Sequence, residues 1–308
     1  MRALLVVNPK ATSTTERTRD VLVHALSSDL KLDLVATQHR GHALELARQA
    51  RRDRLDVVVT LGGDGTINEV VNGLLEEGPG PEVPALALVP GGSANVLARA
   101  LGLPHDPVEA TGQLLEAIAE ERTRAIGLGT ADDRWFTFCA GLGLDAEVIA
   151  AVERARARGV RATPALYVRS AIREFFRSTD RDDPLLTLER PGHDPVHEIF
   201  LAIIQSTSPW TYLGGLPVNP CPQASFDTAL DLVALRSLGV ASTLRHVRQI
   251  LTPNGTPPRG RDVVALHDTA EFTLFARRPV AFQLDGDHLG QRTSITCRDH
   301  PQALRIMM

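Results

Sequence analysis

A glycine-rich stretch around one aspartate is the part of the chain best suited to chemistry. The apolar run 57–61 leads directly into Gly62-Gly63-Asp64-Gly65, and a helical pattern begins immediately after it. Backbone N–H groups and a helix N-terminus that meet at one point form an anion site, whose usual occupant is phosphate. Asp64 would repel a phosphate unless a cation lay between them. The stretch therefore predicts a phosphate-binding loop with a metal ion or a donor beside Asp64. The alternative is a strand–turn–helix connection that binds nothing.

A second candidate site lies near the C-terminal end, where two carboxylates flank a glycine. Asp285-Gly286-Asp287 follows the apolar run 280–284. Carboxylates in this arrangement can hold a water, a metal ion or a substrate hydroxyl. The same three residues are also typical of a hairpin turn between two strands, so the stretch has both a chemical and a structural interpretation.

Phosphoryl transfer is the reaction class that these residues can support, because it depends mainly on positioning and on neutralising charge. Lysine is scarce, with Lys10 and Lys31 the only two in the chain. The sequence contains neither a Gly-x-x-x-x-Gly-Lys-Ser/Thr stretch nor the protein-kinase motif set, which excludes those two mechanisms. Backbone amides and Mg²⁺ must then supply most of the neutralisation.

Strand-like and helix-like segments alternate up to about residue 123, which predicts βαβ units and a parallel sheet. The predicted strands are apolar throughout, as expected when both faces are covered; they span residues 3–7, 32–36, 55–61 and 85–89. The predicted helices span residues 14–26, 42–52 and 67–75, and a further one ends at residue 101. Glycine loops follow the third and fourth strands, so both are expected at the carboxyl edge, where such sheets bind ligands.

After residue 123 the pattern changes to short strands, which predicts an antiparallel, β-sandwich-like domain with inserted helices. The predicted strands are 136–140, 185–188, 199–204, 230–235, 263–265, 272–275, 280–284 and 294–297. The predicted helices are 145–157, 165–177 and 242–251. We therefore expect an α/β protein with a Rossmann-like nucleotide-binding domain over residues 1–123 and a β-rich domain over residues 124–308.

Composition narrows the class of protein further. The net charge of −4 gives no general attraction to nucleic acid. Three widely spaced cysteines fit a reducing compartment and form neither a disulfide framework nor a zinc site. No apolar run approaches the ~20 residues of a membrane span, and the N-terminus is typical of a first strand rather than a signal peptide. We expect a cytoplasmic protein.

An arginine-rich segment stands out against this balance. Residues 151–181 contain eight arginines and three acids, a local net charge of +5. Apolar residues lie among them, including Leu166, Ile172 and Phe176. Such a segment can bind an anionic membrane surface, here the inner face of the membrane. A solvated helix face is the equally weighted alternative.

Taken in order, the motifs of this chain resemble those of the diacylglycerol-kinase-type lipid kinases, which include diacylglycerol, ceramide and sphingosine kinases. The resemblance covers nearly the whole chain. It is carried by Asn8-Pro9, Thr37 with Gly41-His42-Ala43, Gly62-Gly63-Asp64-Gly65-Thr66 with Asn68-Glu69, Pro90-Gly91-Gly92-Ser93-Ala94-Asn95, Ala140 to Ala146, and Gln283 to Asp287.

The resemblance implies an ATP-dependent kinase that uses Mg²⁺ and phosphorylates a lipid hydroxyl, most often that of diacylglycerol, to give phosphatidic acid. It implies nucleotide contacts at Asn8, Thr37, Gly62, Gly63, Asp64, Gly65, Thr66, Asn68, Glu69, Gly92 and Ser93. It assigns catalysis to Asp287, Asp285 and Asp64, with Asp287 favoured as the base, and Asp64 would meet the metal through the nucleotide. The lipid at a membrane surface is the expected partner, with peripheral membrane contact, and a homodimer is considered as well. The last strand, near residues 304–306, is expected to return to the first domain.

Several positions depart from the family pattern. Asp227-Thr228 stands where some members place a structural Mg²⁺ ligand before a glycine, so Asp227 is either a metal ligand or part of an ordinary turn, and the turn is favoured. Val96 and Gly127 replace acids that belong to a metal-linked network in some members. Two alternatives to a lipid kinase remain. One is an NAD kinase, because that family shares Gly62-Gly63-Asp64-Gly65; the other, suggested by the missing acids, is a nucleotide- or lipid-binding regulator that has lost catalysis.

Overall fold

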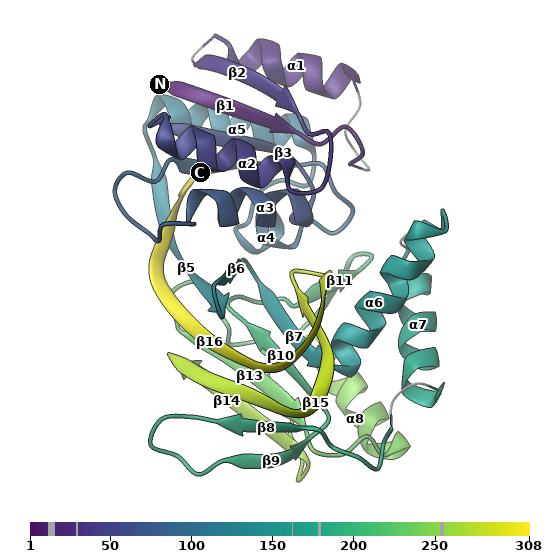
Figure 1. The fold of residues 1–308 in the computed structure, drawn as a ribbon. Coiled ribbons are helices and arrows are strands. Elements are labelled where there is room, and N and C mark those ends of the chain that lie inside the picture. The colour runs from purple at the N-terminus through teal and green to yellow at the C-terminus, as the bar shows by residue number, and fades with distance from the viewer. Residues whose placement is uncertain (12–15, 29, 162, 178–179, 253–255) are drawn as a thin grey trace. The chain divides into compact units, whose positions relative to one another are not determined.

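The computed structural model describes residues 1–11, 16–28, 30–161, 163–177, 180–252 and 256–308. These residues divide into two compact units: residues 1–128 with 301–308, and residues 129–300. Figure 1 shows the order of the elements along the chain. The long strand β16 (Asp287–Met307) begins in the second unit and ends in the first.

The first unit is built on a parallel sheet, as the alternating pattern predicts. Its strands are β1 (Arg2–Val7), β2 (Lys31–Ala36), β3 (Val57–Gly62) and β4 (Ala85–Pro90). They lie in the order β2-β1-β3-β4, and all three pairings are parallel. Ile306, near the end of β16, pairs in parallel with Leu86 of β4. Strands β3 and β4 are buried along their whole length, because helices cover both faces of the sheet.

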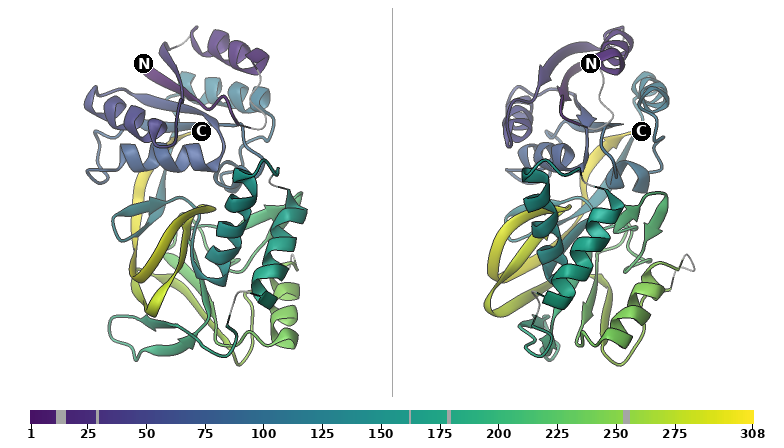
Figure 2. Two further views of the ribbon diagram at one scale, coloured as in Figure 1. Left: turned by 45° about the vertical axis from the view of Figure 1, so that its right-hand side comes forward. Right: turned by 90° about the vertical axis from the view of Figure 1, so that its right-hand side faces the viewer.

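The described residues of this unit form five helices: α1 (Glu16–Leu26), α2 (His42–Arg52), α3 (Asp64–Leu74), α4 (Val96–Ala100) and α5 (Pro107–Ala119). The right-hand view of Figure 2 shows α1 and α5 on one face of the sheet and α2 and α3 on the other. Leu22 and Leu26 of α1 share a core with Leu114 and Ile118 of α5. Helices α2 and α3 approach so closely at Gly73 that a Cβ there would lie 2.3 Å from the carbonyl oxygen of Leu44.

The second unit is built on an antiparallel sheet. Strands follow the order β14-β13-β10-β7-β15-β16, and β8 and β9 extend from β15. The bounds are β6 (Arg134–Phe136), β7 (Cys139–Gly143), β8 (Leu186–Glu189), β9 (Val196–Ile199), β10 (Leu201–Gln205), β13 (Leu230–Leu235), β14 (Val263–Thr269) and β15 (Glu271–Leu284). Strand β5 (Thr123–Ala131) pairs with β6, and β11 (Thr211–Leu213) with β12 (Leu216–Val218) forms a separate hairpin.

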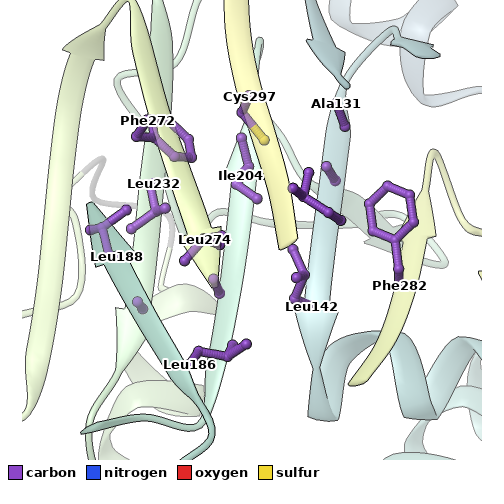
Figure 3. Close-up of a cluster of buried hydrophobic side chains, with 14 of the residues drawn as sticks. Ala131, Leu142, Leu186, Leu188, Ile204, Leu232, Phe272, Leu274, Phe282 and Cys297 are labelled. Carbon is purple, nitrogen blue, oxygen red and sulfur yellow. The ribbon is translucent and has the colours of Figure 1, made fainter. Parts of the chain in front are cut away.

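Strand β10 shows how the second unit is layered. Ala202 and Ile204 belong to the main core, together with Phe136 and many aliphatic side chains. Figure 3 shows Ile204 and Phe272 in this core. Leu201 and Ile203 alternate with them and point to the opposite face, as side chains of a strand must. Helices α6 (Leu144–Ala157), α7 (Pro164–Arg177) and α8 (Val240–Ile250) lie on that opposite side (Figure 2). The α/β class with a parallel and an antiparallel part is therefore confirmed.

Two predicted boundaries differ from the structure for local reasons. Helix α3 begins at Asp64, three residues before the predicted start, because the N–H groups of Thr66 and Ile67 already donate to the Gly63 carbonyl. The predicted strand 136–140 is split between β6 and β7, because Thr137 and Phe138 donate their N–H groups to a carboxylate instead of a neighbouring strand.

Other elements are absent from the sequence prediction or appear there as fragments. Helix α5 is absent from it, although Asp106 caps this helix by accepting from the N–H groups of Val108 and Glu109 and Pro107 occupies its first turn, two standard start signals. The predicted strands 272–275 and 280–284 are one strand, β15, whose pairing with β16 shifts in register between Phe275 and Val280. The start of the predicted helix 14–26 lies outside the described residues.

Candidate functional site

The connection from β3 to α3 has the layout that the sequence predicts. Gly62 ends the strand, Gly63 is the N-cap in an extended conformation, and Asp64 is the first residue of the helix. The glycine N-cap offers no side chain to the first-turn amides of α3. The dipole of an eleven-residue helix makes its N-terminus favourable for an anion.

The two glycine loops touch each other through their backbones. Gly91 donates its N–H to the Gly62 carbonyl at 2.8 Å, continuing the pairing of β3 with β4 beyond Pro90. A Cβ on Gly92 would lie 2.6 Å from the Gly63 Cα, and a Cβ on Gly63 would lie 3.2 Å from the Gly92 Cα. Distances below 3 Å to backbone cannot be relieved by a rotamer change, so glycine is required at position 92 and strongly favoured at position 63.

Asn95 fixes the shape of the second loop, and sequence reasoning did not single it out as a site residue. It is buried and has a left-handed φ of 48°. Its side chain accepts from the Gly92 N–H and donates to the Gly92 carbonyl, both at 2.8 Å. The residue type itself could have indicated this role, because asparagine adopts the left-handed conformation more readily than most other residues with side chains. Ser93 is exposed on the loop that Asn95 holds.

Asp64 lies between the two loops of the first unit. Its Oδ1 is 3.4 Å from the N–H of Leu97, in the first turn of α4. The distance is long for a hydrogen bond, so this contact orients the carboxylate without strongly engaging it. The carboxylate therefore lies beside two loops rich in backbone donors, as the sequence predicts.

Asn8 joins the end of β1 to the start of α3. Its Nδ2 donates to the Thr66 hydroxyl at 2.9 Å, its own N–H donates to the Leu61 carbonyl, and its Oδ1 accepts from the N–H of Lys10. These contacts place Asn8 and Thr66 at the same carboxyl edge as the glycine loops. Thr12 and Ser13, whose hydroxyls are further candidate phosphate donors, lie outside the described residues.

Glu69 and Asn68 make contacts within the fold. Glu69 accepts from the N–H groups of Gly41 and Ala43 at 2.8 and 3.2 Å, so its carboxylate caps the start of α2. Asn68 is buried and accepts from the Asn72 amide. Thr37 follows β2 at the same edge, and its N–H donates to the Val7 carbonyl. Direct contact of Thr37, Asn68 and Glu69 with a nucleotide stays a prediction.

In the second unit, Asp285 and Gly286 form the hairpin turn between β15 and β16. Both have positive φ, 48° and 81°, and Leu284 pairs with Asp287 across the turn, as in a type I′ hairpin. Asp285 is 6% exposed. Its two oxygens accept from the Thr137 N–H and hydroxyl and from the N–H groups of Phe138 and Cys139, at 2.7 to 3.1 Å.

The two carboxylates of the turn are therefore not equivalent. Asp285 is buried and uses both oxygens to hold the connection from β6 to β7. Asp287 is half-buried at the start of β16. A proton acceptor must be reachable by its substrate, and the two carboxylates differ in exposure; the assignment of the base to Asp287 stays a prediction. The hairpin interpretation also holds, because the turn is a tight two-residue loop.

Asp145 is a buried carboxyl that the sequence analysis did not name as a site residue. It lies in the first turn of α6 and accepts from the Gln283 side-chain amide at 2.9 Å. Burial raises the pKa of Asp145 to about 7, and the Gln283 hydrogen bond offsets part of that rise. Gln283 also accepts from the Gly286 N–H at 3.0 Å, so one side chain connects Asp145 to the hairpin turn. A Cβ on Gly141 would collide with the Asp145 carboxylate, so this carboxyl also requires a glycine in the neighbouring strand β7.

No group of three or more His, Cys, Asp and Glu side chains suited to a metal ion occurs among the described residues. Asp227 lies in an exposed turn before β13, which agrees with the favoured interpretation of that segment as an ordinary turn. A protein-built metal cage is therefore not found in this part of the chain. A single carboxylate such as Asp64 fits Mg²⁺ that arrives on nucleotide phosphates, since that ion is often held by one or two carboxylates plus phosphate.

The raised pKa of Asp145 predicts a pH-dependent stability. An acid whose pKa is about 7 in the folded protein, against an ordinary value of 3.8, binds more protons in the folded state between these values. Stability should therefore fall as the pH rises through this window, by on the order of a few kcal/mol for this group alone. Denaturant unfolding at pH 5 and pH 8 measures the loss. Asp145→Asn should lose less stability over the same interval, whereas an equal loss in both proteins would contradict the assignment.

Comparison with known proteins identifies what the chain is similar to. Residues 2–131 match the family model of the diacylglycerol kinase catalytic domain. The diacylglycerol kinase of Staphylococcus haemolyticus is 36% identical over 118 residues, which is 38% of this chain and 33% of the relative. The diacylglycerol kinase of Staphylococcus aureus strain bovine RF122 is 34% identical over 139 residues, which is 44% of this chain and 41% of the relative. The chain thus covers well under half the length of these relatives.

Solved structures extend the likeness to the whole fold. A crystal structure of a diacylglycerol kinase from Bacillus anthracis has a TM-score of 0.71 at 19% identity, covering 99% of this chain and 96% of that one. An ATP complex of an NAD kinase from Archaeoglobus fulgidus has a TM-score of 0.53 at 13% identity, covering 100% and 94%. At these identities the likeness concerns the fold alone. The resemblance read from the motifs is therefore confirmed: residues 2–131 match the diacylglycerol kinase catalytic domain, and the fold is that of a diacylglycerol kinase structure.

Proposed function

We propose that this protein is an ATP-dependent lipid kinase that transfers the γ-phosphate to a lipid hydroxyl, with diacylglycerol as substrate and phosphatidic acid as product. The observation that carries the proposal is the backbone contact of Gly63 with Gly92 beside Asp64. It brings two loops rich in backbone donors to the carboxyl edge of one parallel sheet. A carboxylate among such donors makes chemical sense when a cation and a polyphosphate occupy the site together.

The first unit supplies the nucleotide site in this proposal. The loop that ends at Gly63 and the loop held by Asn95 offer backbone N–H groups, and the N-terminus of α3 adds its dipole. Asn8 and Thr66 support the loop from β1, and the Ser93 hydroxyl is exposed for a phosphate oxygen. Lys10 and Lys31 are the only lysines of the chain, so backbone donors must do much of what a lysine does in P-loop enzymes.

Mg²⁺ would be held by Asp64 through the nucleotide. Bound there, the ion neutralises charge on the transferred phosphoryl group and its leaving phosphate. The role of Asp64 in this proposal is to fix the orientation of the phosphates from the first turn of α3, beside the start of α4.

The second unit supplies the proton acceptor. Asp287 would take the proton of the lipid hydroxyl as that oxygen bonds to the γ-phosphorus and the bond to the leaving ADP breaks. Asp285 holds the turn in place through its four hydrogen bonds, and Gln283 fixes the neighbouring carboxyl of Asp145. Asp285 is thus a positioning residue for Asp287.

The lipid substrate is proposed from the relatives, which are named diacylglycerol kinases and of which this chain covers 33% and 41%. A lipid hydroxyl is presented at a membrane surface, so peripheral membrane contact belongs to the proposal. No helix among the described residues is long and apolar enough to span a membrane.

The substrate assignment is tested with labelled ATP and Mg²⁺ against diacylglycerol, ceramide, sphingosine and NAD, with the products resolved by chromatography. Label should appear in phosphatidic acid. Asp64→Asn should lower kcat by ~100-fold or more, because one group that stabilises transition-state charge is lost. Asp33→Asn, which removes an exposed carboxylate of β2 in the same unit, is the matched control and should retain its turnover. Label in the phosphorylated dinucleotide would indicate an NAD kinase instead, and ATP binding without transfer would indicate a regulator.

Substitutions of the two carboxylates of the hairpin turn should have different effects: one on turnover and the other on stability. Asp287→Asn should lower kcat by ~10²–10⁴-fold with little change in melting temperature, because this side chain is half-buried. Asp285→Asn should lower the free energy of unfolding by about 1–3 kcal/mol, since an amide cannot accept from all the donors that face the carboxylate. Steady-state kinetics and calorimetry on both variants measure these two effects separately. Turnover close to wild type in Asp287→Asn would remove this residue from the mechanism.

A further inference from the structure

Helix α7 carries an outward stripe of apolar side chains next to a row of arginines. Ile172 and Phe176 are each 56% exposed, and Val168 continues the stripe at the same four-residue spacing. Residues four apart lie on one side of a helix, so the stripe is continuous. The arginines each follow one apolar residue and are also exposed: Arg169, Arg173 and Arg177.

Helix α8 repeats this arrangement. Leu244 is 65% exposed, and Val240 and Val247 are exposed on the same side of the helix. Arg245 and Arg248 are exposed beside them. The side chain of His246 points the other way and is buried. Both helices therefore combine a side with buried residues and an exposed side that is apolar and basic.

The two helices cover the same side of the second unit. All views in Figures 1 and 2 place α7 and α8 on that side of its sheet. Phe175 of α7 packs in the cluster that also contains Leu238, just before α8, and Leu201 and Ile203 of β10. Helix α7 and the residue that leads into α8 therefore adjoin the same core. We call the exposed residues of the two stripes the α7–α8 face: Val168, Arg169, Ile172, Arg173, Phe176, Arg177, Val240, Leu244, Arg245, Val247 and Arg248.

The charge of the α7–α8 face has one sign. Neither helix has an exposed acid: Glu174, the only acidic residue of α7, is buried and lies 3.8 Å from Arg154, and α8 contains none. Five exposed arginines thus have no exposed acidic side chain on their own helices. An exposed surface that combines apolar side chains with uncompensated arginine charge is suited to a partner that is both apolar and anionic.

We propose that the α7–α8 face binds the surface of an anionic lipid membrane. The apolar residues would enter the boundary between headgroups and acyl chains, and the arginines would meet the acidic headgroups. A second copy of this chain is a poorer occupant, because a two-fold contact would place this arginine-rich face against itself. The proposal rests on the proposed function, which includes peripheral membrane contact, and deepens it by naming the surface. Membrane binding is measurable without ATP and without turnover, so the two proposals can fail separately.

The structure changes which residues of the arginine-rich segment carry this role. Arg154 is directed to Glu174. The Arg181 guanidinium lies over the rings of Phe175 and Phe176, at 5.1 and 5.6 Å from their centroids. Leu166 is half-buried. Binding is therefore assigned to the outward side of α7 together with α8, a helix outside the segment 151–181 that the sequence analysis considered.

The test is co-sedimentation of the full chain with vesicles, in the absence of ATP. Binding to vesicles of phosphatidylcholine with phosphatidylglycerol should exceed binding to phosphatidylcholine alone and should fall as salt is raised. The variant Arg169→Gln/Arg173→Gln/Arg177→Gln should bind about fivefold more weakly for each arginine removed. A control that removes the same charge elsewhere, Arg52→Gln/Arg278→Gln/Arg298→Gln, should bind like the wild type.

A second pair of variants tests the apolar part of the face. Ile172→Ser/Phe176→Ser/Leu244→Ser should weaken vesicle binding at least tenfold, whereas Val21→Ser/Val108→Ser/Phe275→Ser, which changes exposed residues outside the face, should not. Because all six positions are exposed, melting temperatures should stay close to wild type. Equal binding to neutral and anionic vesicles, or face variants that bind like their controls, would overturn the proposal. Loss of a dimer in the face variants, without loss of vesicle binding, would assign the face to a second copy instead.

Discussion

The close backbone approach of Gly63 and Gly92 is the constraint on which the proposed nucleotide site depends. A Cβ at position 92 would lie 2.6 Å from the Gly63 Cα, so the two loops can touch only while that position has no side chain. The contact follows from the pairing of β3 with β4 and is completed by Asn95, which brackets Gly92 with two hydrogen bonds. Asp64 and the start of α3 are positioned by the same geometry. A phosphate site of this kind consists largely of backbone, which explains how a chain with two lysines can offer one.

In the proposed mechanism, the second unit must hold a carboxylate, that of Asp287, which stays accessible to a substrate. Asp285 uses both oxygens to hold the connection from β6 to β7, and this holds the hairpin whose next residue is Asp287. Gln283 adds a link from the turn to the buried Asp145. Buried polar groups fully satisfied in this way rigidify their surroundings. The turn that leads to the half-buried Asp287 is thus held by two buried carboxyl groups and Gln283.

Much of this could be predicted from the sequence, and the failures have physical causes. The parallel half was readable because β3 and β4 are apolar throughout and glycines follow them, and α2 begins and ends at the predicted residues. Roles decided by contacts far apart in the chain were not readable. The cap that the Glu69 carboxylate provides to α2, from 26 and 28 residues away, is one such role. The split of the predicted strand 136–140 depends on Asp285, well over a hundred residues later. The outward stripe of α7 could be seen from spacing, but its continuation on α8 required the fold.

The most direct test of the nucleotide site is calorimetric titration of ATP with Mg²⁺ into the wild type, Gly92→Ala and Gly80→Ala. A Cβ on Gly80 would meet no atom within 4 Å, and this residue lies outside both loops, so it controls for the substitution itself. If the contact of Gly63 with Gly92 shapes a phosphate site, Gly92→Ala should bind ATP at least about tenfold more weakly, a change of ~1.4 kcal/mol, while Gly80→Ala binds like the wild type. Circular dichroism confirms that each variant is folded. Unchanged ATP affinity in a folded Gly92→Ala protein would contradict the account, because the two loops would then be connectors only.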